Sequence, residues 1–153
     1  MKRYRIEKYK SLEEVTLYTI REEGKTNNET DDFILRFKDD PKFKQDVETI
    51  TYYIQKIGER GALERNFRPE KRAVAIPISS SKLRLYGYRV NNSILILGNG
   101  GEKTSKKVQD SPDAFPHFEL MNFVAYVFNL KLEKQEITIE KRDLKGDFSF
   151  FVK

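Results

Sequence analysis

Two β-rich runs in the middle of the chain constrain its fold more than any other feature. Residues 83–90 (LRLYGYRV) largely alternate apolar and polar side chains, and residues 93–97 (SILIL) form a short apolar run. Asn91 and Asn92 lie between the runs, and asparagine tolerates the positive φ of tight hairpin turns. The segment therefore predicts a β-hairpin whose second strand ends at Gly98, before a glycine-rich and then lysine-rich loop.

The first strand of this hairpin has two different faces. Because side chains alternate across a strand, Leu83 and Leu85 share one face, and Arg84, Tyr86 and Tyr88 share the other. The second set suits RNA, since guanidinium groups hold phosphates and aromatic rings stack on unpaired bases. Arginine and tyrosine are also ordinary residues of a solvated sheet face, and the strand by itself leaves both interpretations open.

Positive charge is concentrated around the same hairpin. The chain has 29 Lys+Arg against 24 Asp+Glu, and residues 60–107 hold 11 of the cations but 3 of the acids. A basic centre within a slightly acidic remainder predicts a localised anion-binding surface. The alternative is a solvated basic face without a ligand.

Length and composition set the outer bounds. A chain of 153 residues is expected to form one domain, residues 1–153, with a sizeable core. The absence of cysteine excludes disulfides, thiolate metal sites and cysteine nucleophiles. No apolar run approaches the ~20 residues that cross a bilayer, and the start lacks a secretory pattern. A cytoplasmic location without membrane contact is the expectation.

Three helices and several strands are predicted around the hairpin. Asn28 is a candidate N-cap of a first helix, and Asp40-Pro41 is a candidate start of a second one that ends near Gly58 or Gly61. The acidic pairs at these helix starts, Asp31-Asp32 and Asp39-Asp40, are interpreted as helix caps rather than metal ligands. The remaining predicted elements are strands 2–9, 15–20 and 73–78, a turn over 79–81, a helix 117–132 and two strands within 135–153.

This order predicts an α+β fold with an antiparallel sheet and helices packed on one face. The other face is expected to be open, concave and basic.

Three short segments resemble a known family. Phe67-Arg68, residues 83–86 (LRLY) and residues 96–104 (ILGNGGEKT) are similar to the pattern FR…LRLY…ILGNGG-x-KT, found in a branch of the RelE/ParE superfamily of bacterial toxins. The resemblance covers roughly residues 29–130 and implies a RelE-like core. The N-terminal hairpin, 2–21, and the C-terminal strands, 135–153, would be additions to that core.

The resemblance also implies a function. Members of the superfamily are typically ribosome-dependent endoribonucleases or gyrase poisons, and each is held inactive by a cognate antitoxin. The expectation is therefore a type II toxin that cleaves mRNA on the ribosome and binds an antitoxin of the helix-turn-helix type, without metal or cofactor. A non-catalytic toxin, for example a gyrase-targeting one, and a nucleic-acid- or protein-binding module on the same fold remain alternatives.

The resemblance names candidate site residues. In metal-independent cleavage the RNA 2′-OH attacks the adjacent phosphate, so the protein supplies cations and acid/base groups. Arg84 and Lys103 match basic functional positions of the family. Tyr86 is the third catalytic candidate, for base stacking or, if nearby cations lower its pKa from the usual ~10, for proton transfer. The candidate RNA-binding residues are Arg68, Lys82, Arg89, Lys106 and Lys107, and His117, the single histidine, is a further acid/base candidate.

The glycine-rich segment does not fit a nucleotide-binding P-loop. In the Walker pattern a glycine directly precedes Lys-Ser/Thr, whereas Glu102 stands before Lys103-Thr104 here. The glycines are instead expected to let the strand end turn sharply, so that Lys103 is presented beside the sheet.

Overall fold

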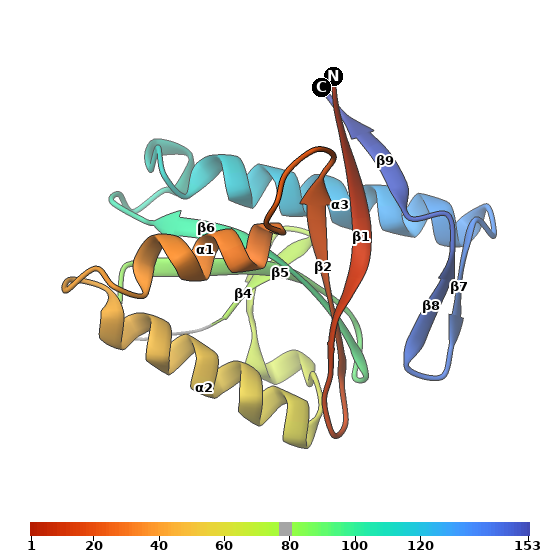
Figure 1. Cartoon of the computed structure of the whole chain (residues 1–153), viewed down its shortest axis with the longest axis horizontal. Coiled ribbons are helices and arrows are strands. Elements are labelled where there is room, and N and C mark those ends of the chain that lie inside the picture. The colour runs from red at the N-terminus through yellow and green to blue at the C-terminus, as the bar shows by residue number, and fades with distance from the viewer. Residues whose placement is uncertain (77–80) are drawn as a thin grey trace.

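The structure is a computed structural model that describes residues 1–76 and 81–153. In these residues a seven-stranded sheet has the order β3-β4-β5-β6-β2-β1-β9, and β7 and β8 form a separate two-stranded sheet (Figure 1). The strands are β1 (Lys2–Ser11), β2 (Thr16–Glu22), β3 (Arg68–Glu70), β4 (Ala73–Ala75), β5 (Leu83–Asn91), β6 (Ile94–Glu102), β7 (Ile137–Glu140), β8 (Asp143–Gly146) and β9 (Ser149–Val152). The helices are α1 (Glu29–Phe37), α2 (Lys44–Arg60) and α3 (Phe115–Glu133).

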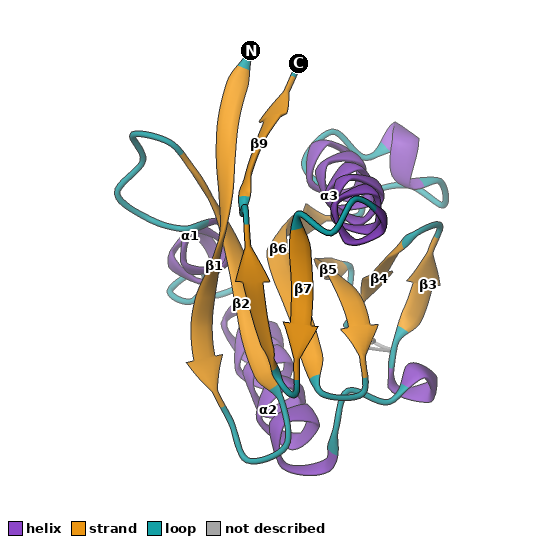
Figure 2. Cartoon of the chain, turned by 90° about the vertical axis from the view of Figure 1, so that its right-hand side faces the viewer, coloured by secondary structure: helices purple, strands orange, loops and turns teal. Residues whose placement is uncertain are grey.

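The α+β class is confirmed, but two finer expectations are wrong. The sheet is mixed, because β2 runs parallel to β6, whereas β2 pairs antiparallel with β1 and β6 pairs antiparallel with β5. The helices lie on both faces: α1 and α2 pack on one, and α3 packs on the other (Figure 2). The second face is therefore covered over most of its length and is not an open surface.

Strand β6 explains why both faces must be covered. Residues 94–97 are four consecutive apolar side chains, and each is fully buried. Ile94 and Ile96 pack with α3, whereas Leu95 and Leu97 pack with α1 and α2. A continuous apolar run is typical of a strand buried on both sides, and alternation is typical of a strand with one wet face.

The predicted hairpin is present as β5 and β6, with its turn displaced by one residue. The link consists of Asn92 and Ser93, and neither has a positive φ. The Asn91 side chain instead accepts a hydrogen bond from the Ser93 backbone N–H at 2.7 Å. An asparagine that closes its own turn in this way does not need a left-handed backbone.

The helix signals are confirmed at most ends. The Asn28 side chain accepts a hydrogen bond from the Asp31 N–H at 2.8 Å and caps α1. Helix α2 ends at Arg60, and its C-cap is Gly61, whose positive φ of 107° is one that glycine adopts without strain. The predicted start of α2 at Pro41 is wrong, because residues 41–43 form a turn and the helix begins at Lys44.

The terminal strands are built into the sheet. The β1–β2 hairpin lies between β6 and β9, so β2 is a central strand, and β9 extends the sheet by pairing with β1. Hairpin β7–β8 packs against the α3 face, where the Leu144 N–H donates to the Tyr18 hydroxyl at 2.9 Å.

The segment before β5 differs from its prediction. Residues 68–70, expected in a loop, form the edge strand β3, which pairs with β4. The predicted strand over 73–78 is described as β4 (Ala73–Ala75), and its expected end falls on residues 77–80, outside the described part. Most of the serine turn predicted at 79–81 falls there as well.

Candidate functional site

Strand β5 places its polar face beneath the start of α3. The predicted alternation is confirmed: Leu83 and Leu85 pack toward α1 and α2, while Tyr86 packs toward α3. Tyr86 is 1% exposed, and its ring meets Phe118 edge-to-face at a centroid distance of 5.9 Å. Burial raises the pKa of Tyr86, the charge of Glu70 raises it further, and Arg84 and Arg68 only partly oppose this.

These surroundings contradict the role expected of Tyr86. A ring with almost no exposed surface cannot stack on a nucleobase, and a phenol with a raised pKa is a poor proton carrier at neutral pH. Tyr86 forms the floor of the site beneath α3.

Arg84 lies half-buried at the beginning of the same strand. Its Nη1 donates to the backbone oxygens of Ser81, at 2.6 Å, and Leu83, at 3.1 Å. Its Nε is buried and has no partner among the described residues. Burial, and next the neighbouring charge of Arg68, lower the pKa of Arg84. The guanidinium is thus held in place, with part of its hydrogen-bonding capacity unused within the described chain.

Strand pairing brings Arg68 and Glu70 onto the face of Tyr86. Arg68 is opposite Ala75 in the β3–β4 ladder, and Ala75 is opposite Tyr86 in the β4–β5 ladder. Directly opposed residues share a face, and neighbouring strands are about 4.8 Å apart. Glu70, opposite Ala73, belongs to the same face.

Glu70 is the centre of this group. Burial raises the pKa of the half-buried Glu70 carboxyl, while Lys103, Arg68 and Arg84, in decreasing order, lower it. Within residues 1–76 and 81–153, no ion pair or side-chain hydrogen bond commits Glu70 to any of these cations. We call Arg68, Glu70, Arg84 and Lys103 the Glu70 cluster; it is one carboxylate whose pKa is raised by burial and lowered in part by the charges of three nearby cations.

The sequence prediction missed Glu70. Its signal is visible in the sequence, because Glu70 is the single acid between Arg65 and Gly101, within the basic centre. The prediction treated this acid as part of a loop. The short edge strand β3, which carries it back over β5, is set by tertiary pairing.

The predicted RNA-binding residues fall into two groups. Arg68, Lys82, Lys106 and Lys107 are exposed, and the Lys103 N–H donates to the Lys82 carbonyl at 2.7 Å, which keeps the loop after β6 beside the start of β5. Arg89 is different: its guanidinium donates to the Ala62 carbonyl at 2.6 Å and to the Asn92 side chain. Arg89 lies about 17 Å along β5 from Arg84 and stabilises the far end of the hairpin.

The glycine-rich segment is a continuation of β6, so the expected sharp turn at Gly98 is wrong. Strand β6 runs to Glu102, and the backbone hydrogen bonds of its last residues are completed by side chains. Thr30 Oγ1 donates to the Gly98 carbonyl at 3.0 Å, and Asp113 accepts from the Glu102 N–H at 2.8 Å. A Cβ at Gly98 would overlap the side chain of Met121, so glycine here lets α3 lie directly on the strand.

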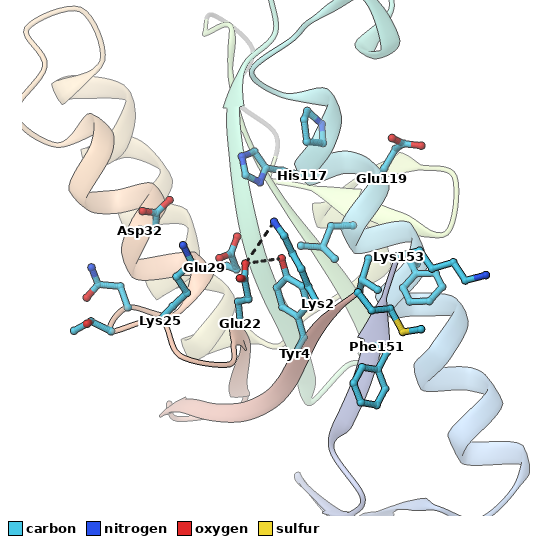
Figure 3. Close-up of a pocket in the computed structure, with 17 residues that line it drawn as sticks. Lys2, Tyr4, Glu22, Lys25, Glu29, Asp32, His117, Glu119, Phe151 and Lys153 are labelled. Atoms are coloured by element: carbon cyan, nitrogen blue, oxygen red, sulfur yellow. Dashed lines mark hydrogen bonds and ion pairs between the residues drawn. The ribbon is translucent and has the colours of Figure 1, made fainter.

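His117, in the first turn of α3, faces a different cavity. This cavity, of about 1030 Å³, lies between α3, the N-terminal half of α1 and the β1 and β9 ends, and no member of the Glu70 cluster lines it (Figure 3). Burial, and then the charge of Arg36, lower the pKa of His117 against the opposing effects of Asp113 and Asp32. His117 is therefore not part of the site around Arg84.

The same cavity has an acidic side formed by Glu22, Glu29 and Asp32. Burial raises the pKa of Glu29, and the nearby Asp32 and Glu22 raise it further against a hydrogen bond from Asn99. In the described residues, no three histidine or acidic side chains are arranged to hold a metal ion.

Comparison with models of protein families, with curated proteins and with solved structures finds no match to this chain. Among the described helices, none has the length and apolar character needed to span a membrane.

Proposed function

We propose that the protein is the toxin of a type II toxin–antitoxin pair and acts as a metal-independent endoribonuclease on mRNA at the ribosome. The observation that carries this proposal is the Glu70 cluster. It places a carboxylate with a raised pKa among three cations on one partly exposed surface. The sequence resemblance to RelE/ParE toxins supports the same assignment, and a cognate antitoxin is the expected partner.

The cluster has the groups that this chemistry needs. The Glu70 carboxylate takes the proton of the RNA 2′-OH as that oxygen attacks the adjacent phosphorus. The bond to the 5′ oxygen breaks, that oxygen takes a proton from water, and a 2′,3′-cyclic phosphate remains. A carboxyl whose pKa is raised is a stronger base than an ordinary glutamate, which suits it to this step.

The three cations stabilise the negative charge that builds on the phosphoryl oxygens. Arg84 is already oriented by two backbone carbonyls, so little reorganisation is needed when the phosphate arrives. Arg68 and Lys103 are not engaged in ion pairs within the described chain and are available to the phosphate. Tyr86 supports this arrangement from below as a packed aromatic side chain.

The test is induced expression in bacteria, with growth and transcript 5′ ends recorded together. Wild type is compared with Glu70→Gln, Arg84→Ala and Lys103→Ala, and with Lys145→Ala as a control for the loss of an exposed lysine on β8. We expect growth arrest with new cleavages inside translated messages for wild type and Lys145→Ala. Each cluster variant should lose both effects while remaining folded.

The outcomes separate the alternatives. Growth arrest with intact messages would replace the ribonuclease proposal by a toxin with another target, such as gyrase. Folded protein without arrest would overturn the toxin proposal and favour a binding module. Cleavage that persists in Glu70→Gln would show that Glu70 is not the base.

A further inference from the structure

A hollow beside the Glu70 cluster lies between α3 and the turn that joins β3 to β4. It has a volume of about 450 Å³ and is lined by Arg72, Tyr88, Tyr126, Asn129, Leu130 and Glu133. The turn is held against the helix because Asn122 Oδ1 accepts the backbone N–H of Arg72 at 2.7 Å and of Ala73 at 2.8 Å. Lys71, at the tip of the turn, has a φ of 62°.

Tyr126 and Arg72 give the hollow an aromatic face and a cation. The Tyr126 side chain is 46% exposed, and the Arg72 guanidinium carbon lies 5.1 Å from the centre of its ring. Planar arginine beside an exposed ring is an arrangement on which nucleobases stack.

Asn129 and Tyr88 supply polar groups to the lining of the hollow. Asn129 Nδ2 donates to the Tyr88 hydroxyl at 2.9 Å and to the Ala125 carbonyl at 2.8 Å, which orients the amide. Asn129 Oδ1 has no hydrogen bond within the described residues and is an acceptor for an exocyclic amine.

The charge of the hollow favours a base over a phosphate. Arg72 and Glu133 carry opposite charges on its lining, so the hollow is nearly neutral, unlike the Glu70 cluster with its three cations. An uncharged aromatic ring is accommodated there without an unpaired charge, whereas a phosphate would lie near the Glu133 carboxylate.

The hollow is also at the right place relative to the cluster. Arg72 follows Glu70 by two residues, and Tyr88 follows Tyr86 by two residues on the same face of β5, about 7 Å further along the strand. Both elements therefore lead from the proposed phosphate site to the hollow.

We propose that this hollow binds a nucleobase next to the scissile phosphate, by stacking on Tyr126 and Arg72. The proposal rests on the proposed function, because it assigns a substrate subsite to that reaction. It makes Tyr126 and Arg72 residues that position single-stranded RNA, with no part in bond breaking.

The test uses a single-stranded RNA of about eight nucleotides, labelled with fluorescein and 2′-O-methylated throughout, so that it binds without being cleaved. Its affinity is measured by fluorescence anisotropy for wild type, Tyr126→Leu and Tyr126→Phe. Tyr52→Leu is the matched control, since Tyr52 is an exposed tyrosine of α2 with the Lys56 ammonium 5.4 Å from its ring centre, on the other side of the sheet.

We expect Tyr126→Leu to weaken binding roughly 5- to 100-fold, as for the loss of one stacked base. Tyr126→Phe, which keeps the ring, and Tyr52→Leu should stay within about twofold of wild type. Thermal unfolding shows whether each variant is folded, and a misfolded Tyr126→Leu is replaced by Arg72→Gln, for which a weaker but measurable loss is expected.

Unchanged affinity in Tyr126→Leu, or an equal loss in Tyr52→Leu, would overturn the subsite. So would undetectable binding of the RNA to wild type. Cleavage of translated messages is scored separately: binding that depends on Tyr126, without cleavage by wild type, would refute the ribonuclease and leave a nucleobase-binding hollow without a scissile phosphate beside it. Cleavage by wild type, together with RNA binding that is independent of Tyr126, would support the ribonuclease and refute the subsite.

Discussion

Arg36 joins helix α1 to the open edge of β6, and its replacement by methionine should measurably destabilise the fold. Among the described residues, strand β2 pairs with β6 only from Ile94 to Leu97, and no described strand pairs with the later residues of β6 on that side. Arg36 Nη2 donates to the Asn99 side chain at 2.7 Å and to the Gly100 carbonyl. Methionine keeps an apolar stem near the ring of Phe37 but removes these donors.

The magnitude follows from the groups that Arg36→Met leaves behind. The Gly100 carbonyl loses its donor, which costs about 1–3 kcal/mol for a poorly exposed acceptor. Asn99 Oδ1 still accepts a hydrogen bond from the Gly100 N–H at 2.7 Å, so the loss of the Arg36 donor costs little stability there. The ion pairs with Asp32 and Asp113 involve half-exposed carboxylates and contribute about 0.2–1 kcal/mol each. The expected total is about 1.4–5 kcal/mol, or a Tm lower by about 3–20 °C for a chain of this size.

The assay is urea unfolding followed by far-UV circular dichroism, with a thermal scan in parallel. Arg65→Met is the matched control, because Arg65 is exposed and its side chain makes no hydrogen bond in the described part of the chain. We expect the midpoint of Arg36→Met to fall with little change in m-value, and that of Arg65→Met to stay within about 0.5 kcal/mol of wild type. A loss below 0.5 kcal/mol in Arg36→Met would refute the assignment of the β6 edge to Arg36.

Three further predictions follow from the same structure. Gly100→Ala should prevent stable folding, because its Cβ would overlap the Arg84 backbone carbonyl. Gly98→Ala should lower the unfolding midpoint by a smaller amount, because its Cβ overlaps the flexible Met121 side chain and makes an ordinary contact with the Tyr86 carbonyl. Glu29→Gln should be more stable than wild type at pH 7: burial raises the pKa of Glu29, so the folded state holds its proton to higher pH, and wild-type stability falls as pH rises through that window. The advantage should disappear below pH about 4, and an equal advantage at all pH values would contradict it. For cleavage, log kcat/KM should rise with pH over a range above the ordinary glutamate pKa of about 4.3, because burial raises the pKa of the proposed base Glu70. A pH profile without that rise would exclude Glu70 as the base.

The sequence predicted local features well because they depend on neighbours along the chain. The Asn28 cap and the alternation of Leu83 and Tyr86 follow from local geometry and are confirmed, and α2 ends at the second of the two glycines predicted for it, Gly58 or Gly61. The clustering of basic residues near β5 was also visible as composition.

Long-range pairing explains what the prediction missed. The parallel contact of β2 with β6 joins residues more than 70 positions apart, and periodicity does not specify a partner strand. The apolar run 94–97 is typical of a strand buried on both faces, but the prediction of an open face did not use it, and the packed structure shows that α3 covers that face.

The candidate site divides in the same way. The sequence by itself determined that Arg84 and Tyr86 share a face and that Arg68 and Lys103 belong to a basic region, because alternation and charge are local properties. The tertiary structure decided that Tyr86 is a buried floor, that Arg89 and His117 lie elsewhere, and that Glu70 stands among the cations. The physical reason is that a side chain's exposure and pKa depend on the groups folded over it, and here those groups come from β3, β6 and α3.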